Sequence, residues 1–104
     1  MKVLKLIILL VLSFTSFVVF TKDGNHKGQE KSVLCQGCHG LKGISTNTEW
    51  PNIANQNYEY LYKSINDYKF EKRFDPLMTP IAKTLSEDDI HNLAGYYSSI
   101  ESSN

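Results

Sequence analysis

The segment Cys35-Gln36-Gly37-Cys38-His39 constrains this chain more than any other, because it has the form C-x-x-C-H. Two thiols on a short helical turn, with two residues between them, span one edge of a porphyrin, where they can add to its two vinyl groups. The imidazole of the adjacent His39 then faces the iron. The segment therefore predicts one covalently attached haem c, with Cys35 and Cys38 as attachment points and His39 as an iron ligand.

Other uses of the two cysteines fit the sequence less well. A zinc site needs further ligands, and only His26 and His91 remain outside the motif. A thioredoxin-like C-x-x-C lies beside strands, and no alternating strand pattern is present. A structural disulfide gives no role to His39, and a bridge across so short a loop constrains the unfolded chain little.

The first 21 residues differ from the rest of the chain. Lys2 and Lys5 form a basic start, and residues 6–20 carry no charge. As a helix, residues 6–20 would rise about 22 Å, which is shorter than the hydrocarbon core of a bilayer. Length favours a signal peptide, whereas the lack of an Ala-x-Ala cleavage pattern favours a retained anchor. We expect residues 1–21 to be one of these two, and residues 22–104 to be a monohaem domain that is periplasmic, either soluble or tethered to the outer face of the cytoplasmic membrane.

Charge and size limit the partners and the core. The chain has 104 residues, and without residues 1–21 its formal charge is −2. Such a charge gives no basic surface for nucleic acid, so no nucleic-acid partner is expected. A domain this small buries little apolar surface, which favours a core completed by a cofactor.

The spacing of apolar residues predicts an all-α fold with three main helices and long loops around the haem. The first helix is expected over residues 28–38, after a flexible lead-in over 21–27, and an irregular loop follows over 41–57. Residues 58–68 form an amphipathic helix that Asn55 or Asn57 can cap. The last helix begins after Ser86 and continues to residue 100, with acidic residues in its first turn.

Met78 is the candidate for the second axial ligand of the iron. It is the only methionine beyond the N-terminal segment, and it lies between Pro76 and Pro80 in a loop that neither proline allows to be helical. The rival interpretation is that Met78 fills a gap in the core. His26 and His91 are expected to be surface histidines rather than ligands.

The sequence resembles the class I c-type cytochromes, with most likeness to the cytochrome c553 and cytochrome c4 group. The likeness covers nearly all of residues 28–100. Its motifs are Gly28-Gln29-Glu30-Lys31, Cys38-His39-Gly40, Trp50-Pro51-Asn52-Ile53-Ala54, Tyr60-Leu61, Asp75-Pro76-Leu77-Met78-Thr79-Pro80-Ile81-Ala82, Leu85-Ser86-Glu87-Asp88-Asp89-Ile90 and Leu93-Ala94-Gly95-Tyr96-Tyr97. Cytochrome c4 has two such domains and two haems, whereas this chain has one C-x-x-C-H.

The resemblance implies specific roles. Cys35 and Cys38 would be thioether sites, His39 the proximal ligand and Met78 the distal ligand. The carbonyl of Pro51 would accept a hydrogen bond from the other ring nitrogen of His39. The first and last helices would cross closely, with Gly28 and Gly95 as the small residues and Tyr96 or Tyr97 as the packing aromatic side chain.

An iron with both axial positions filled has no open site for substrate, so the sequence predicts an electron-transfer protein rather than an enzyme. We expect a one-electron carrier in an extracytoplasmic respiratory chain, with redox proteins such as a membrane cytochrome complex and a terminal oxidase or reductase as partners. The alternatives are a haem subunit of a larger oxidase or dehydrogenase, anchored through residues 6–20, and a haem-based sensor or peroxidase. The residues expected to line an apolar haem pocket are Tyr58, Leu61, Tyr62, Ile65, Leu77, Ile81, Leu93 and Tyr97.

Overall fold

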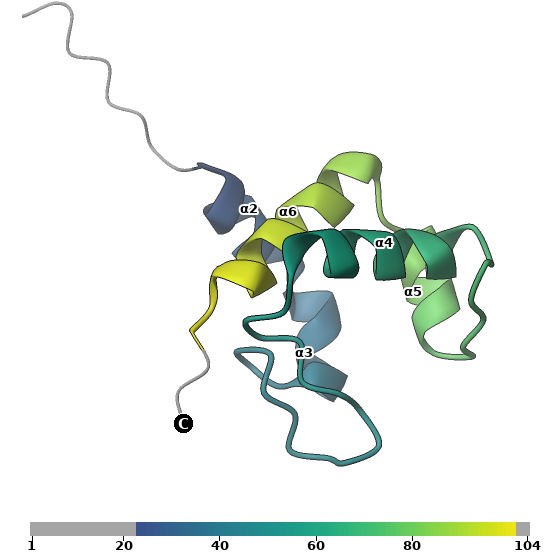
Figure 1. The fold of residues 1–104 in the computed structure, drawn as a ribbon, viewed down its shortest axis with the longest axis horizontal. Coiled ribbons are helices and arrows are strands. Elements are labelled where there is room, and N and C mark those ends of the chain that lie inside the picture. Colours follow the sequence, from purple (N-terminus) through teal and green to yellow (C-terminus); the bar gives the residue numbers. More distant parts are fainter. Residues whose placement is uncertain (1–22, 102–104) are drawn as a thin grey trace, which may run out of the picture.

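The structure is a computed structural model that describes residues 23–101, and within that range it is helical without strands (Figure 1). The elements are α2 (Asp23–Lys31), α3 (Val33–His39), α4 (Tyr58–Lys69), α5 (Met78–Lys83) and α6 (Glu87–Ser99). The predicted all-α class is therefore confirmed. The predicted signal peptide or anchor over residues 1–21 lies outside the described residues. Within them, every helix is too short or too polar to cross a membrane.

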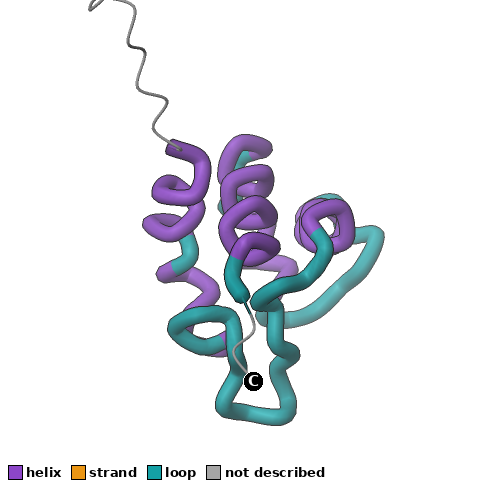
Figure 2. The backbone as a smooth tube through the Cα atoms, turned by 60° about the vertical axis from the view of Figure 1, so that its left-hand side comes forward, coloured by secondary structure: helices purple, strands orange, loops and turns teal. Residues whose placement is uncertain are grey.

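Helices α2 and α6 pack side by side, as expected for the first and last helices (Figure 2). A Cβ atom added to Gly28 would come within 2.2 Å of the main-chain oxygen of Asn92 and 2.6 Å of the Cβ of Tyr96. Only glycine permits this approach, because real Cβ atoms do not come so close to other atoms. The same role predicted for Gly95 is wrong, since a Cβ there would meet nothing within 4 Å.

The predicted helix over residues 28–38 is two helices, and the first begins earlier than expected. Residues 23–31 already form α2, so the expected flexible lead-in is wrong from Asp23 onward. Ser32 separates α2 from α3 and is fully buried. Its hydroxyl donates to the carbonyl of Gln29 at 2.5 Å. A serine that bonds the backbone in this way competes with the regular helical pattern, and α3 starts afresh after it.

Helix α4 begins as the sequence predicts. The side chain of Asn57 accepts a hydrogen bond from the main-chain N–H of Tyr60 at 3.1 Å, which caps the first turn. The preceding segment, residues 41–57, has no regular secondary structure, as expected.

The segment expected to be a non-helical loop between two prolines contains the short helix α5. Pro80 is the third residue of α5. The expectation is wrong because proline disturbs a helix only where its missing N–H and its ring matter. The first N–H groups of a helix have no intrahelical acceptor, so proline fits in the first turn.

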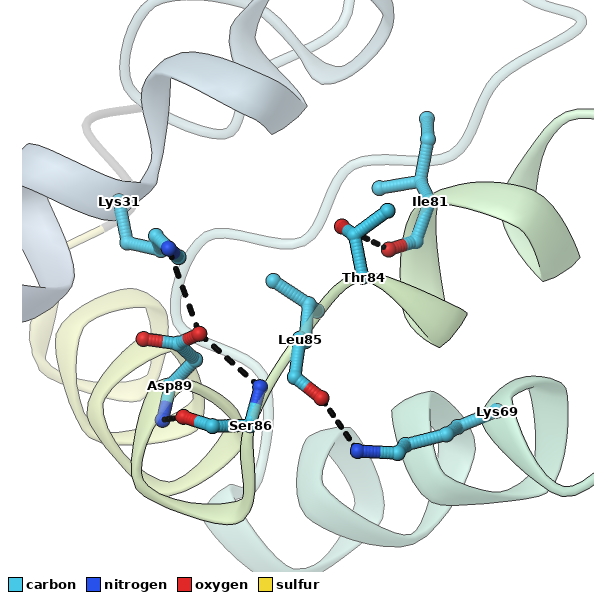
Figure 3. A network of polar contacts seen from close by, with 7 residues as sticks. All are labelled: Lys31, Lys69, Ile81, Thr84, Leu85, Ser86 and Asp89. Carbon is cyan, nitrogen blue, oxygen red and sulfur yellow. Dashed lines mark hydrogen bonds and ion pairs between the residues drawn. The ribbon is translucent and has the colours of Figure 1, made fainter.

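Helix α6 begins after Ser86, as expected, with a capping box, and polar contacts at its start connect it to α2 and α4 (Figure 3). The Ser86 hydroxyl accepts from the N–H of Asp89 at 3.1 Å, and the Asp89 carboxylate accepts from the N–H of Ser86 at 3.0 Å. The same carboxylate lies 3.3 Å from the ammonium of Lys31 at the end of α2. On the other side, the Lys69 ammonium of α4 donates to the carbonyl of Leu85.

Candidate haem site

A cavity of about 500 Å³ opens between α3, α4, α5 and α6. The lining residues come from four parts of the chain and from the loop between α3 and α4. They are Leu34, Cys35, Cys38 and His39 of α3; Glu49, Trp50, Pro51 and Ile53 of the loop; Leu61, Ser64, Ile65 and Tyr68 of α4; Arg73, Asp75, Leu77, Met78 and Ile81 in and before α5; and Leu85, Leu93 and Tyr97 in and before α6. Most of these side chains are apolar or aromatic, so the cavity suits a large apolar ligand.

The cysteines lie one turn apart on α3, and both are free thiols facing this cavity. Burial raises the pKa of the Cys35 thiol, the Tyr97 hydroxyl lowers it, and the neighbouring Cys38 raises it further. Before any attachment, the thiol of Cys35 therefore favours its protonated form. Both cysteines line the same cavity, as attachment to a single group requires.

His39 is the last residue of α3 and only 8% exposed. Its Nδ1 donates to the carbonyl oxygen of Pro51 at 2.7 Å. A carbonyl can only accept, so Nδ1 carries the proton and Nε2 keeps a lone pair free for a metal. Such a partner fixes the ring and raises its basicity as a ligand.

The loop that presents Pro51 is folded back onto Gly43. The Gly43 carbonyl accepts from the main-chain N–H groups of Ile53 at 2.8 Å and Ala54 at 3.0 Å. Gly43 has φ of 78°, and a Cβ there would lie 2.9 Å from both the Ala54 nitrogen and the Tyr97 ring. Glycine is thus required twice over, by the backbone angle and by the close approach.

Met78 is the first residue of α5. It is far along the chain from the two cysteines, yet it lines the same cavity. The Asp75 carboxylate accepts from the main-chain N–H of Leu77 at 2.8 Å and of Met78 at 2.7 Å. These two hydrogen bonds lower the pKa of the Asp75 carboxyl, and the one from Met78 has the larger effect.

Tyr97 brings a polar atom into the cavity wall. The residue is 2% exposed, and its hydroxyl makes no hydrogen bond of normal length and angle among the described residues, although it interacts with the Cys35 thiol. Burial raises the pKa of Tyr97, with smaller contributions from Cys35. A buried hydroxyl without a well-formed hydrogen bond is uncommon in a folded protein, and Tyr97 is one of the residues that line the cavity.

Six of the eight residues predicted to line the haem pocket do so, and two tyrosines of α4, Tyr58 and Tyr62, do not. Their rings stack with His91, and the Tyr62 and His91 centroids are 4.5 Å apart. The Tyr58 hydroxyl contacts Nδ1 of His91, and the Tyr62 hydroxyl donates to Glu87 at 2.7 Å.

Both remaining histidines are exposed and away from the cavity, as expected. His26 pairs with Glu30 one turn along α2, at 3.1 Å. The lining residues that the sequence did not predict include Trp50, Tyr68 and Arg73. Tyr68 follows Leu61 and Ile65 at helical spacing, so its place was open to prediction, whereas Trp50 and Arg73 lie in loops without any period.

The sequence profile of the family described as Cytochrome c matches residues 26–101. The chain belongs to the cytochrome c family. It is 40% identical over 77 residues to cytochrome c-554(548) of Halomonas halodenitrificans, covering 71% of this chain and 93% of that protein. It is also 35% identical over 92 residues to cytochrome c4 of Pseudomonas aeruginosa, covering 88% of this chain and 45% of that protein.

Among solved structures, this cytochrome resembles reduced recombinant cytochrome c4 from Pseudomonas stutzeri, with a TM-score of 0.72 at 22% sequence identity. The match covers 78% of this chain and 50% of the other. The chain thus spans about half the length of the cytochromes c4 that it matches. At this identity the likeness establishes the fold, which is the class I cytochrome c fold that the sequence predicts.

As a member of this family the cytochrome binds covalently attached haem c, and one haem suits a domain of this size. The residues around the cavity fit that group. Two free thiols and an imidazole lie on one element, a thioether lies on another, and an apolar wall surrounds them. Among the described residues, the Tyr97 hydroxyl is the one buried side-chain nitrogen or oxygen atom without a well-formed hydrogen bond, and Tyr97 also lines the cavity.

Proposed function

We propose that this cytochrome carries single electrons between redox proteins, with Cys35 and Cys38 holding the haem through thioether bonds and His39 and Met78 as its axial ligands. The observation that carries the proposal is that these four residues, distributed over 44 positions of sequence, line one cavity. The bound haem supplies a one-electron Fe(II)/Fe(III) couple.

The protein's own residues set how that couple behaves. The hydrogen bond from His39 to Pro51 holds the imidazole in one orientation and one tautomer. Met78 offers a soft thioether, which favours the ferrous state relative to harder ligands. The apolar lining, including Leu61, Ile65 and Leu93, penalises the additional charge of the ferric state.

With two protein ligands on the iron, no coordination position is left for a substrate, and the cytochrome is an electron-transfer protein rather than an enzyme. Its partners are then other redox proteins, met through small and short-lived contacts. We place it in an extracytoplasmic respiratory chain, in the periplasm or at the outer face of the cytoplasmic membrane. The C-x-x-C-H segment and the apolar residues 6–20 support this placement.

The ligand assignment is tested by replacing Met78 with alanine in the haem-loaded protein. The ferric wild-type protein is expected to have the far-red charge-transfer band of a sulfur-to-iron bond, and Met78→Ala to lose it. The ferrous variant should bind carbon monoxide readily, whereas the wild type should not. A variant with an unchanged spectrum would show that another residue is the distal ligand.

A second function has one observation in its favour. A relative from Chlorobaculum tepidum, 31% identical over 78 residues, is named a cytochrome subunit of sulfide dehydrogenase. This cytochrome would then serve as the fixed haem subunit of a larger dehydrogenase or oxidase. Sequencing the N-terminus of the mature protein and measuring its mass under native conditions separates the two. A free carrier starts near residue 22 and runs as a small protein, whereas a fixed subunit purifies with partners.

A further inference from the structure

We propose that Asp75 is the positioning residue of Met78: its carboxylate fixes the main chain from which the thioether reaches the cavity. The inference deepens the proposed function and rests on Met78 being the distal ligand. It concerns a residue that lies three positions before the methionine and lines the same cavity.

The first turn of α5 depends on this one residue. The first N–H groups of a helix have no intrahelical acceptor. Leu77 is the N-cap of α5 and provides no side-chain acceptor. A single carboxylate oxygen of Asp75 accepts instead from the N–H of Leu77 and of Met78, and the carbonyl of Asp75 accepts from the N–H of Thr79 at 3.0 Å. Pro80 follows and has no N–H to satisfy.

The same residue is held in place by the turn that it organises. The main-chain N–H of Asp75 donates to the hydroxyl of Thr79 at 2.9 Å, and Thr79 is 2% exposed. Asp75 and Thr79 thus exchange hydrogen bonds in both directions around Met78. The low pKa of the Asp75 carboxyl agrees with this arrangement, because charged oxygens accept from N–H groups more strongly than neutral ones.

A carboxylate of comparable placement elsewhere in the chain provides the matched control. Asp89 also accepts a main-chain N–H at a helix start, that of Ser86, but belongs to the capping box of α6 and does not line the cavity. Removing either carboxylate takes away a helix cap. Only the loss of Asp75 should change the bond between Met78 and iron.

The experiment compares haem-loaded wild type with Asp75→Ala, Asp75→Asn, Asp75→Gln and Asp89→Ala. The readouts are the far-red charge-transfer band of the ferric protein and the affinity of the ferric protein for imidazole, which competes with Met78. We expect Asp75→Ala to weaken the band and to bind imidazole about tenfold more tightly, a change that corresponds to about 1.4 kcal/mol. Asp89→Ala should lower the unfolding midpoint while leaving both readouts as in the wild type.

The variants Asp75→Asn and Asp75→Gln distinguish an effect of the position of the side-chain oxygen from an effect of its negative charge. Asp75→Asn keeps an oxygen at the same reach and should retain the band, whereas Asp75→Gln has the same neutral amide one methylene further out and should weaken the band as Asp75→Ala does. If Asp75→Ala does not accumulate with haem, this pair carries the test alone.

Two results would overturn the proposal: an imidazole affinity of Asp75→Ala equal to that of the wild type, or identical behaviour of the asparagine and glutamine variants. Either result, obtained while Met78→Ala still abolishes the band, refutes the role of Asp75 and leaves the ligand assignment intact. An unchanged band in Met78→Ala refutes the ligand assignment itself.

Discussion

Nδ1 of His39 and the carbonyl oxygen of Pro51 lie 2.7 Å apart, although 12 positions of sequence separate the two residues. The intervening loop is anchored at both ends. Ser45 donates its main-chain N–H to the Asn52 side chain at 2.7 Å, and its hydroxyl donates to the carbonyl of Cys38 at 3.2 Å. The orientation of the imidazole is therefore set by the loop rather than by α3 alone.

Loosening that loop is expected to raise the reduction potential. Pro51→Gly keeps the carbonyl but frees its backbone, so the hydrogen bond from His39 weakens and the imidazole becomes a poorer donor to the ferric iron. We expect a rise of less than about 60 mV, the one-electron equivalent of a tenfold change. Redox titration measures the potential, and NMR measures the exchange of the His39 ring proton, which should quicken. Thr48→Gly, at an exposed position of the same loop, should change neither.

Gly28 is expected to tolerate no side chain. Gly28→Ala places a Cβ against the main chain of Asn92 and the Cβ of Tyr96, neither of which can move without shifting α6. We expect a loss of about 1–3 kcal/mol of stability, measured by denaturant unfolding of the haem-loaded protein. Gly95→Ala is the matched control. Its Cβ meets nothing, and alanine is a better helix former, so stability should rise by about 0.5–1 kcal/mol. Equal effects at the two glycines would contradict the packing described above.

Removing the N-cap of α6 should lower stability without touching the haem site. Ser86→Ala loses the acceptor for the N–H of Asp89, which costs about 1 kcal/mol. The melting temperature should fall by about 4–8 °C, as expected for a domain of this size. Thr46→Ala, which also removes a hydroxyl but at an exposed loop position, serves as the control and should leave the melting temperature unchanged. A change in the visible spectrum of Ser86→Ala would indicate that the box and the cavity are coupled.

Tyr97 is expected to make the fold sensitive to alkaline pH. Burial raises its pKa, so the unfolded chain releases this proton near pH 10 while the folded protein retains it. The stability from the protonated hydroxyl is fully present below pH 10 and is lost as pH rises toward the folded pKa, by about 1.4 kcal/mol per pH unit. Unfolding midpoints recorded against pH should fall less steeply in Tyr97→Phe. Parallel curves for the two proteins would show that Tyr97 ionises normally in the fold.

The sequence predicted best what is determined locally. Ser86 and Asn57 cap the helices that they precede, because a cap depends on residues within one turn. The spacing of residues 58–68 predicted α4 correctly for the same reason. The four proposed haem-binding residues were found by their chemistry and their motif, and the structure places all four on one cavity.

The errors arose where distant parts of the chain decide the outcome. Tyr58 and Tyr62 belong to the apolar stripe of α4, yet both rings stack on His91 of α6 and neither residue lines the cavity. Helical spacing cannot reveal which part of a stripe faces a partner. Gly95 lies between Asn92 and Tyr96, the two residues that Gly28 meets, yet a Cβ at Gly95 would meet nothing within 4 Å, and only the packed pair of helices defines which of these positions faces the partner. The helix α5 has six residues, too few to establish a period.

Leu61, Leu85, Leu93 and Tyr97 belong to the buried core cluster and line the cavity as well. At these four positions the same side chains form the environment of the haem and the packing of the core. A polar substitution at any of them, which shifts the potential, also removes packing from the core. In evolutionary terms, selection on the potential at these positions also acts on stability, and selection on one of them restricts the other.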